Sequence, residues 1–138
     1  MLTSMRKRKP RKYQVFLSHA TSDKWLATLL CSKIEELGAK TFRDDRDIDG
    51  GEDIPDAIRA AIDNSDEMVL LLTPVSVKRP WVLMEAGAAW QRGIRIVAVL
   101  QHIQIEPIPS MLKSKKVYDL NEFELYLDEL QSRVKVAP

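Results

Sequence analysis

The feature of this 138-residue chain that most constrains its fold is an alternation of short apolar runs with segments of helical periodicity. The runs YQVFLSHA, AKTFRDD, EMVLLLTP, IRIVAVL and KVYDL have the length and composition of strands. In the segments between them, apolar residues recur every three or four positions, as on one face of a helix. Strands that alternate with helices in this way predict a parallel sheet with helices on both faces.

The charge content of the five runs predicts their order in the sheet. Strands buried on both faces are almost continuously apolar, which fits the first, third and fourth runs. The second and fifth runs carry charged residues, as edge strands do. These placements give the order 2-1-3-4-5 of flavodoxin-like sheets, so we expect an α/β three-layer sandwich with a five-stranded parallel sheet.

The periodic segments predict which side chains face the core. The first helix has one apolar stripe, formed by Leu26, Leu29, Leu30, Ile34 and Leu37. The single cysteine, Cys31, lies in the same helix, and we expect it to be a small core residue. The last helix is expected to begin at Asn121, with Glu124 three residues later completing a capping box.

The length of the chain suggests one domain, which we expect to span residues 13–134. Residues 1–12 hold six basic and no acidic side chains, which predicts a flexible, solvated tail, and residues 135–138 form a C-terminal tail. Six charges in a tail do not by themselves indicate nucleic-acid binding. No apolar run approaches the roughly 18 residues of a membrane span, and no signal-peptide core follows the basic start. We therefore expect a cytoplasmic protein with no membrane partner.

Several kinds of site are not supported by the sequence. A response-regulator receiver needs an aspartate after the third strand and a lysine after the fifth, and both are missing here. No glycine-rich phosphate loop and no GxSxG turn is present. His19, His102 and Cys31 do not have the spacing of zinc ligands, so we expect no metal site.

The stretch RPWVLMEAGAAW contains the strongest candidate for a functional residue. Pro80 suits the first position of a helix, and Glu85 then has apolar residues three and four positions away on both sides. Trp81 lies one turn before Glu85 and shares its face. A carboxylate beside an indole suits cleavage of a glycosidic bond, since the ring offers a flat surface and the charge can face an oxocarbenium ion.

The predicted sheet brings further polar side chains toward the same place. In open parallel sheets, ligands bind outside the carboxyl ends of the strands. The residues expected at that edge are, strand by strand, Ser18 and His19, then Asp44, Asp45 and Arg46, then Pro74 and Ser76. The helix that contains Glu85 follows the third strand, so its first turns border the same edge.

Three stretches of the chain resemble Toll/interleukin-receptor (TIR) domains. VFLSHATSDK resembles the first signature box of that family, and FRDDRDIDGGEDI resembles its second strand and BB loop. WVLMEAGAAWQRG resembles the αC segment of bacterial TIR proteins. The three stretches occur in the family's order and spacing, and the resemblance covers about residues 13–132.

The resemblance implies two functions. One branch of the family cleaves the nicotinamide–ribose bond of NAD and releases nicotinamide with ADP-ribose or a cyclised form, in bacteria as part of antiphage signalling. Its key residue is a glutamate four positions after a tryptophan, a spacing matched by Trp81 and Glu85. Many members of that branch have cysteine after the tryptophan, whereas this chain has Val82. The second function is that of a non-catalytic scaffold or adaptor that acts by TIR–TIR assembly.

In the enzymatic reading, NAD is a substrate and no cofactor is needed. Nicotinamide leaves as a neutral molecule, so one carboxylate, Glu85, can suffice. Trp81 would form the wall beside nicotinamide, and Ser18, His19, Asp45 and Arg46 would contact ribose and phosphates. Ser76, five positions before Trp81, matches a serine often seen in the family and is expected to bind substrate.

The loop from Arg46 to Ile54 would gate this site, and it contains Asp49, Gly50 and Gly51. The resemblance also implies that a neighbouring copy completes the site, so we expect self-association, with a sensor or effector protein as a further partner. The nucleoside deoxyribosyltransferase-like enzymes share the fold and a catalytic glutamate, but the Ser-His box and the BB-loop pattern favour a TIR domain.

Overall fold

The protein was analysed as a computed structural model that describes residues 11–45, 54–104 and 116–136. The strands are β1 (Gln14–Ser18), β2 (Lys40–Arg43), β3 (Glu67–Leu72), β4 (Arg95–Leu100) and β5 (Lys116–Asp119). The helices are α2 (Lys24–Glu35), α3 (Asp56–Asp63), α4 (Pro80–Arg92) and α6 (Phe123–Val136). Short 3-10 turns, η1 (Thr21–Asp23), η2 (Ser76–Lys78) and η3 (Leu120–Glu122), precede α2, α4 and α6.

The strands form one parallel sheet in the order β2-β1-β3-β4-β5, which confirms the predicted flavodoxin-like topology. Every residue of β1 and β3 is buried, whereas the edge strands β2 and β5 are only partly covered. This gradient follows from the sequence, because charged side chains remain solvated only at the edges of a sheet whose two faces are covered.

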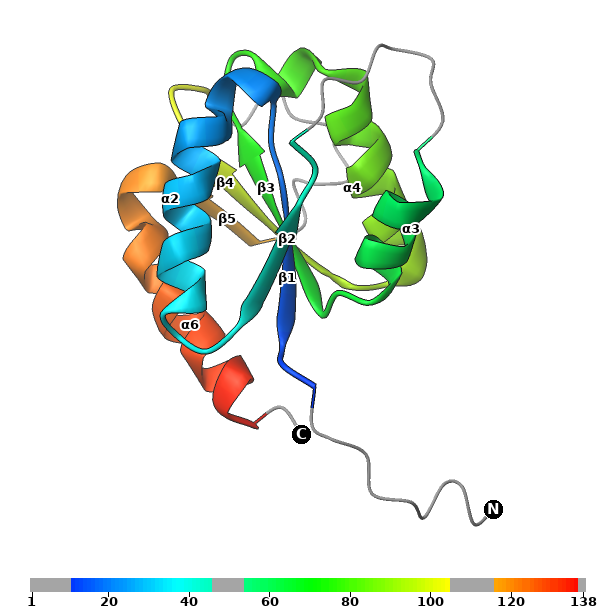
Figure 1. Ribbon diagram of the computed structural model, residues 1–138. Coiled ribbons are helices and arrows are strands. Elements are labelled where there is room, and N and C mark those ends of the chain that lie inside the picture. Colours follow the sequence, from blue (N-terminus) through cyan, green and yellow to red (C-terminus); the bar gives the residue numbers. More distant parts are fainter. Residues whose placement is uncertain (1–10, 46–53, 105–115, 137–138) are drawn as a thin grey trace.

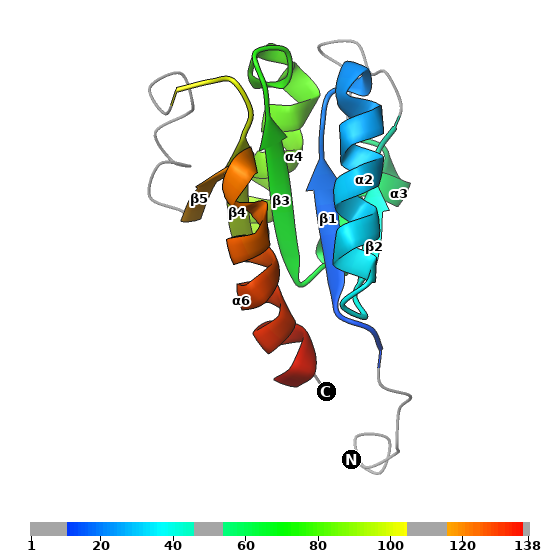
Figure 2. The same cartoon turned by 90° about the vertical axis from the view of Figure 1, so that its left-hand side faces the viewer.

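Helices cover both faces of the sheet, with α2 and α6 on one side and α3 and α4 on the other (Figure 1). Successive residues of each central strand point to opposite faces, so Phe16 packs toward α3 and α4 while Leu17 packs toward α2 and α6. Figure 2 shows α2 and α6 side by side in front of the sheet. The two apolar clusters therefore form a three-layer sandwich, as predicted.

The α4 helix follows its prediction closely. Pro80 occupies the first helical position, and Gly93 ends the helix with a φ of 74°, in the left-handed region that favours glycine. The buried face includes Trp81, Glu85 and small alanines, so the helix packs close to the sheet. Glu85 is thus carried on an element whose position is fixed by the core.

Two details of the other helices differ from expectation. Leu29 is 41% exposed, because the buried stripe of α2 runs along Ala27, Leu30, Cys31 and Ile34. Leu29 lies two residues from Ala27, about 200° around the helix and therefore away from the sheet. The expected core position of Cys31 is confirmed.

The start of the last helix was also misplaced by the sequence. The Asp119 side chain accepts the Asn121 N–H at 2.9 Å, and Glu122 accepts the Asp119 N–H at 3.0 Å. The capping box is therefore formed by Asp119 and Glu122 around η3, two residues earlier than the predicted pair Asn121 and Glu124. The predicted and the observed pair have the same spacing, and the end of β5 at Asp119 places the capping box at the observed pair.

No helix in the described ranges is long and apolar enough to cross a membrane. The described chain begins at Arg11, inside the predicted basic tail. Its guanidinium donates to both carboxylate oxygens of Asp66, at 2.7 and 2.6 Å, and so anchors the chain beside β3. The predicted limits of the tails and of the domain remain predictions.

Candidate functional site

Glu85 lies at the carboxyl edge of the sheet, against the end of β1. The Ser18 hydroxyl, from the last residue of β1, donates a hydrogen bond of 2.7 Å to Glu85 Oε1. Ser18 is 1% exposed and Glu85 is 2% exposed. Two residues far apart in the sequence are thus joined in a nearly closed position, and the serine fixes one oxygen of the carboxylate.

His19, the next residue, is buried and uses both ring nitrogens. Nδ1 lies 2.7 Å from the carbonyl oxygen of Ala20, and Nε2 lies 2.9 Å from Asp45 Oδ1. Asp45 also receives the Arg43 Nε–H, at 3.0 Å from Oδ1 and 3.2 Å from Oδ2, and Lys24 Nζ lies 4.0 Å away. This cluster ties the end of β1 to the end of β2. The predicted contacts of His19 and Asp45 with substrate stay predictions.

The turn after β3 is held by reciprocal hydrogen bonds. Ser76 Oγ donates to the Leu71 carbonyl at 2.8 Å and accepts the Thr73 N–H at 2.8 Å, and the Ser76 N–H donates to Thr73 Oγ1 at 3.1 Å. Ser76 has no exposed surface. The structure gives Ser76 a local role in shaping the turn that leads into α4, and its predicted contact with substrate stays a prediction.

Trp81 is 4% exposed and belongs to the core cluster beneath α4. The Arg79 guanidinium lies 5.6 Å from the centroid of its ring, within cation–π range. In this arrangement the indole offers little surface to a ligand. The predicted role of Trp81 as the wall beside nicotinamide stays a prediction.

Part of the predicted site falls outside the described residues. Arg46, Asp49, Gly50 and Gly51 all lie in the undescribed range 46–53. Ile54, the last residue of the predicted gating loop, is partly buried and packs against the core cluster under α3 and α4. Among the described residues, no group of three or more His, Cys, Asp or Glu side chains is arranged to hold a metal ion.

Sequence reasoning missed one pair of polar residues at this edge. Thr73 Oγ1 donates a hydrogen bond of 2.7 Å to Asp23 Oδ2, which links the turn after β3 to η1. The signal was present in the sequence, since Thr73 directly follows an apolar strand and Asp23 precedes the first helix. Parallel strands bring both positions to one edge of the sheet.

Comparison with known protein families decides which fold family this is. The family model described as the TIR domain matches residues 15–131, most of the chain. The chain belongs to the TIR-domain family. In this TIR domain, the Ser-His box lies at the end of β1 and the αC-like segment forms α4. The Ser18–Glu85 hydrogen bond joins these two segments.

Solved structures confirm the fold of the TIR domain. The TIR domain of the Toll-related receptor TRR-2 from Hydra magnipapillata is 19% identical, with a TM-score of 0.68, covering 91% of this chain and 99% of that one. The Clostridium botulinum CMP N-glycosidase BcmB is 21% identical, with a TM-score of 0.55 and coverages of 86% and 98%. The TIR heterodimer of RPS4 and RRS1 is 15% identical, with a TM-score of 0.59 and coverages of 90% and 96%. No match was found among curated protein sequences.

Proposed function

We propose that this TIR domain cleaves the nicotinamide–ribose bond of NAD, with Glu85 as the catalytic carboxylate. The observation that carries the proposal is the position of Glu85, which is 2% exposed at the carboxyl edge of the sheet and accepts the Ser18 hydroxyl at 2.7 Å. Burying a carboxylate costs free energy, so a buried glutamate at the ligand-binding edge of the sheet is a candidate functional group. The neighbouring N-glycosidase BcmB supports the proposal at the level of the fold, since its named reaction breaks the same class of bond.

The proposed chemistry needs one carboxylate and no metal. Nicotinamide in NAD carries a positive charge and leaves neutral, so its departure needs no proton donor, and charge builds instead on the ribose ring. Glu85 would accept hydrogen bonds from ribose hydroxyls and stabilise the oxocarbenium-like transition state. Water at the anomeric carbon would give ADP-ribose, and an adenine nitrogen there would give a cyclic product.

Ser18 acts in this proposal as a positioning residue. Its hydrogen bond fixes one carboxylate oxygen of Glu85. A hydrogen bond to a charged group contributes about 1.5–3 kcal/mol, so its loss should lower turnover about tenfold or more. Rate should fall more than substrate affinity if Ser18 orients the carboxylate rather than binding NAD.

Access to Glu85 connects the proposed activity to assembly. Because Glu85 and Trp81 are almost fully covered, NAD can reach the carboxylate only after groups at the edge of the sheet move. The TIR heterodimer among the structural neighbours shows that domains of this fold pair with one another. We propose that self-association opens and completes the site, with bacterial antiphage signalling as the setting and a sensor or effector as partner.

A scaffold function is the second candidate, and a surface feature favours it. Trp25 on α2 is 79% exposed and Trp90 on α4 is 51% exposed, on helices that cover opposite faces of the sheet. Large exposed aromatic side chains are common in protein interfaces. An adaptor would use such surfaces for TIR–TIR contacts and would not depend on the carboxylate of Glu85.

The deciding experiment incubates concentrated protein with NAD and separates nicotinamide, ADP-ribose and cyclic products by chromatography. Glu85→Gln should abolish product formation, because the amide keeps the shape but removes the charge. Glu36→Gln is the matched control, since Glu36 is exposed at the end of α2 and far from the site. If the wild type leaves NAD intact at concentrations where it demonstrably self-associates, the enzymatic proposal is wrong and the scaffold is favoured.

A further inference from the structure

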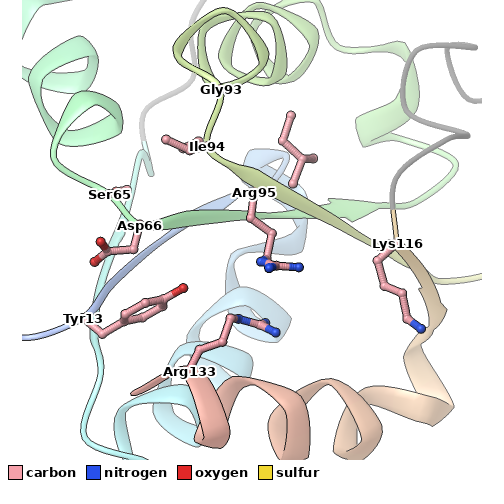
Figure 3. A pocket seen from close by; sticks show the side chains of 9 residues that line it. Tyr13, Ser65, Asp66, Gly93, Ile94, Arg95, Lys116 and Arg133 are labelled. Atoms are coloured by element: carbon pink, nitrogen blue, oxygen red, sulfur yellow. The ribbon is translucent and has the colours of Figure 1, made fainter. Parts of the chain in front are cut away.

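A second pocket lies at the opposite edge of the sheet from Glu85. It has a volume of about 760 Å³ and opens between the amino ends of the strands and the last turns of α6 (Figure 3). Such a volume lies in the range of small-molecule sites. Basic side chains from three separate elements line it: Arg95 from β4, Lys116 from β5 and Arg133 from α6.

The register of the sheet explains why these cations meet. Arg95 is the Cα partner of Glu67 across the β3–β4 pair, so both side chains point to the face covered by α6. Lys116 is the partner of Val97, which lies two residues after Arg95 and therefore on the same face. Figure 3 shows the guanidinium groups of Arg95 and Arg133 directed into the same space, with the Lys116 ammonium on the far side.

Arg133 is held in place by a buried carboxylate. Its Nε and Nη2 donate to the two oxygens of Glu67 at 2.8 and 3.1 Å, and Glu67 has no exposed surface. Tyr126 and Tyr13 add phenol hydrogen bonds to Glu67 at 2.6 and 2.7 Å. A guanidinium has five N–H donors, so the Glu67 contact leaves three for a ligand on a side chain that is already immobilised.

The charges around the pocket do not balance within the described part of the chain. Glu67 is paired with Arg133, and Asp66 is paired with Arg11. Lys116 lies 3.8 Å from Glu129. Arg95 makes no hydrogen bond or ion pair with another described residue, although Glu129 is close enough to be influenced by its charge. Among the described residues, the positive charge of this pocket that has no paired acid is therefore that of Arg95.

We propose that this pocket binds the phosphate group of a small molecule. Arginine N–H groups match the geometry of phosphate oxygens, and lysine adds a compact charge beside them. Arg95, Lys116 and the free donors of Arg133 would approach one phosphate from three directions. The remaining volume, toward Tyr13 and Asp66, has an aromatic surface and a hydrogen-bond acceptor for the rest of the ligand.

The test is titration of the complete chain with pyrophosphate at low ionic strength, followed by calorimetry. The wild type should bind one equivalent saturably, and Arg95→Gln should weaken binding about tenfold or more, as expected for loss of a charge-assisted hydrogen bond. Arg59→Gln is the matched control, because Arg59 is an exposed arginine on α3 without a side-chain partner in the described residues. Absence of saturable binding, or equal weakening in both variants, would overturn the proposal.

Two further arms locate the bound phosphate and identify its source. Glu85→Gln should bind pyrophosphate as the wild type does, because it lies at the other edge of the sheet, and weakened binding in this variant alone would overturn the proposal. Duplex DNA serves as the polymeric phosphate. If DNA binds in an Arg95-dependent manner while pyrophosphate does not, the pocket reads nucleic acid and the small-molecule proposal is wrong. Arg95→Gln should keep the wild-type circular dichroism and thermal midpoint, since its side chain is exposed.

Discussion

Replacement of Arg133 by methionine tests the buried network under α6. Among the described residues, Arg133 supplies two of the four hydrogen bonds to Glu67 and the positive charge that faces it, from a side chain that is 19% exposed. Methionine fills similar volume but leaves the Glu67 carboxylate in the interior with two phenol donors. Breaking a buried pair from one side costs about 3–5 kcal/mol, and the partial exposure of Arg133 places the expected loss near 3 kcal/mol.

The assay is urea unfolding followed by far-ultraviolet circular dichroism, with the free energy of unfolding extrapolated to water. A loss of about 3 kcal/mol should lower the thermal midpoint by about 10 °C in a domain of this size. The double variant Glu67→Gln/Arg133→Met should be more stable than Arg133→Met alone, because the second change removes the uncompensated charge.

Two results would refute the reasoning. One is a loss below about 1 kcal/mol in Arg133→Met, which would mean that the ion pair is effectively solvated. The other is additive destabilisation in the double variant, which would mean that the two residues act independently. Arg133→Lys is an intermediate case, because it keeps the charge but loses the two-pronged geometry.

Three further predictions concern pH and backbone. Burial, aided by nearby carboxylates, raises the pKa of every tyrosine above 10, and that of Tyr118 to about 12. The contribution of the tyrosines to stability is therefore complete below pH 10 and is lost as the pH rises through the folded-state pKa values. Tyrosinate absorbance should appear together with unfolding, and its appearance in folded protein near pH 10 would contradict this prediction. Desolvation alone would raise the pKa of Asp66, but hydrogen bonds from Arg11 and a backbone N–H lower it. The contribution of Asp66 to folding stability is therefore present above its ordinary pKa near 4 and is lost as the pH falls. Arg11→Ala should weaken the dependence of the thermal midpoint on pH in the acid range, and unchanged melting curves would count against the pairing. Gly87→Ala should stabilise α4 by about 0.5–1 kcal/mol, since an added Cβ meets no atom within 4 Å. Gly93→Ala should destabilise the protein by about 1–2 kcal/mol, because the φ of Gly93 is 74°. Urea unfolding that ranks the stabilities of the two variants in the opposite order would refute this prediction.

The same physical rules explain where sequence reasoning succeeded at the site and where it stopped. Glu85 and Ser18 could be placed at one edge, because parallel strands present their carboxyl ends together. That Ser76 would be fully buried, with its hydroxyl hydrogen-bonded to the main chain, could not be predicted, since a serine after a strand suits a turn and a ligand contact equally well. The buried position of Glu67 was missed, because Glu67 begins a run that was interpreted as fully apolar. A single charged residue in such a run was the signal that it has a buried partner.

The sequence by itself determined the layer architecture and strand order of this TIR domain, because periodicity and charge content are local properties that each segment carries with it. It also determined the helical frame of Glu85, through Pro80 at the first position and Gly93 at the end. Only the tertiary structure decided which polar groups meet. Arg133 and Glu67 lie 66 residues apart, and Ser18 and Glu85 lie 67 apart. Such contacts depend on how helices are seated on the sheet, and that seating is set by the packing of the whole core rather than by any one segment.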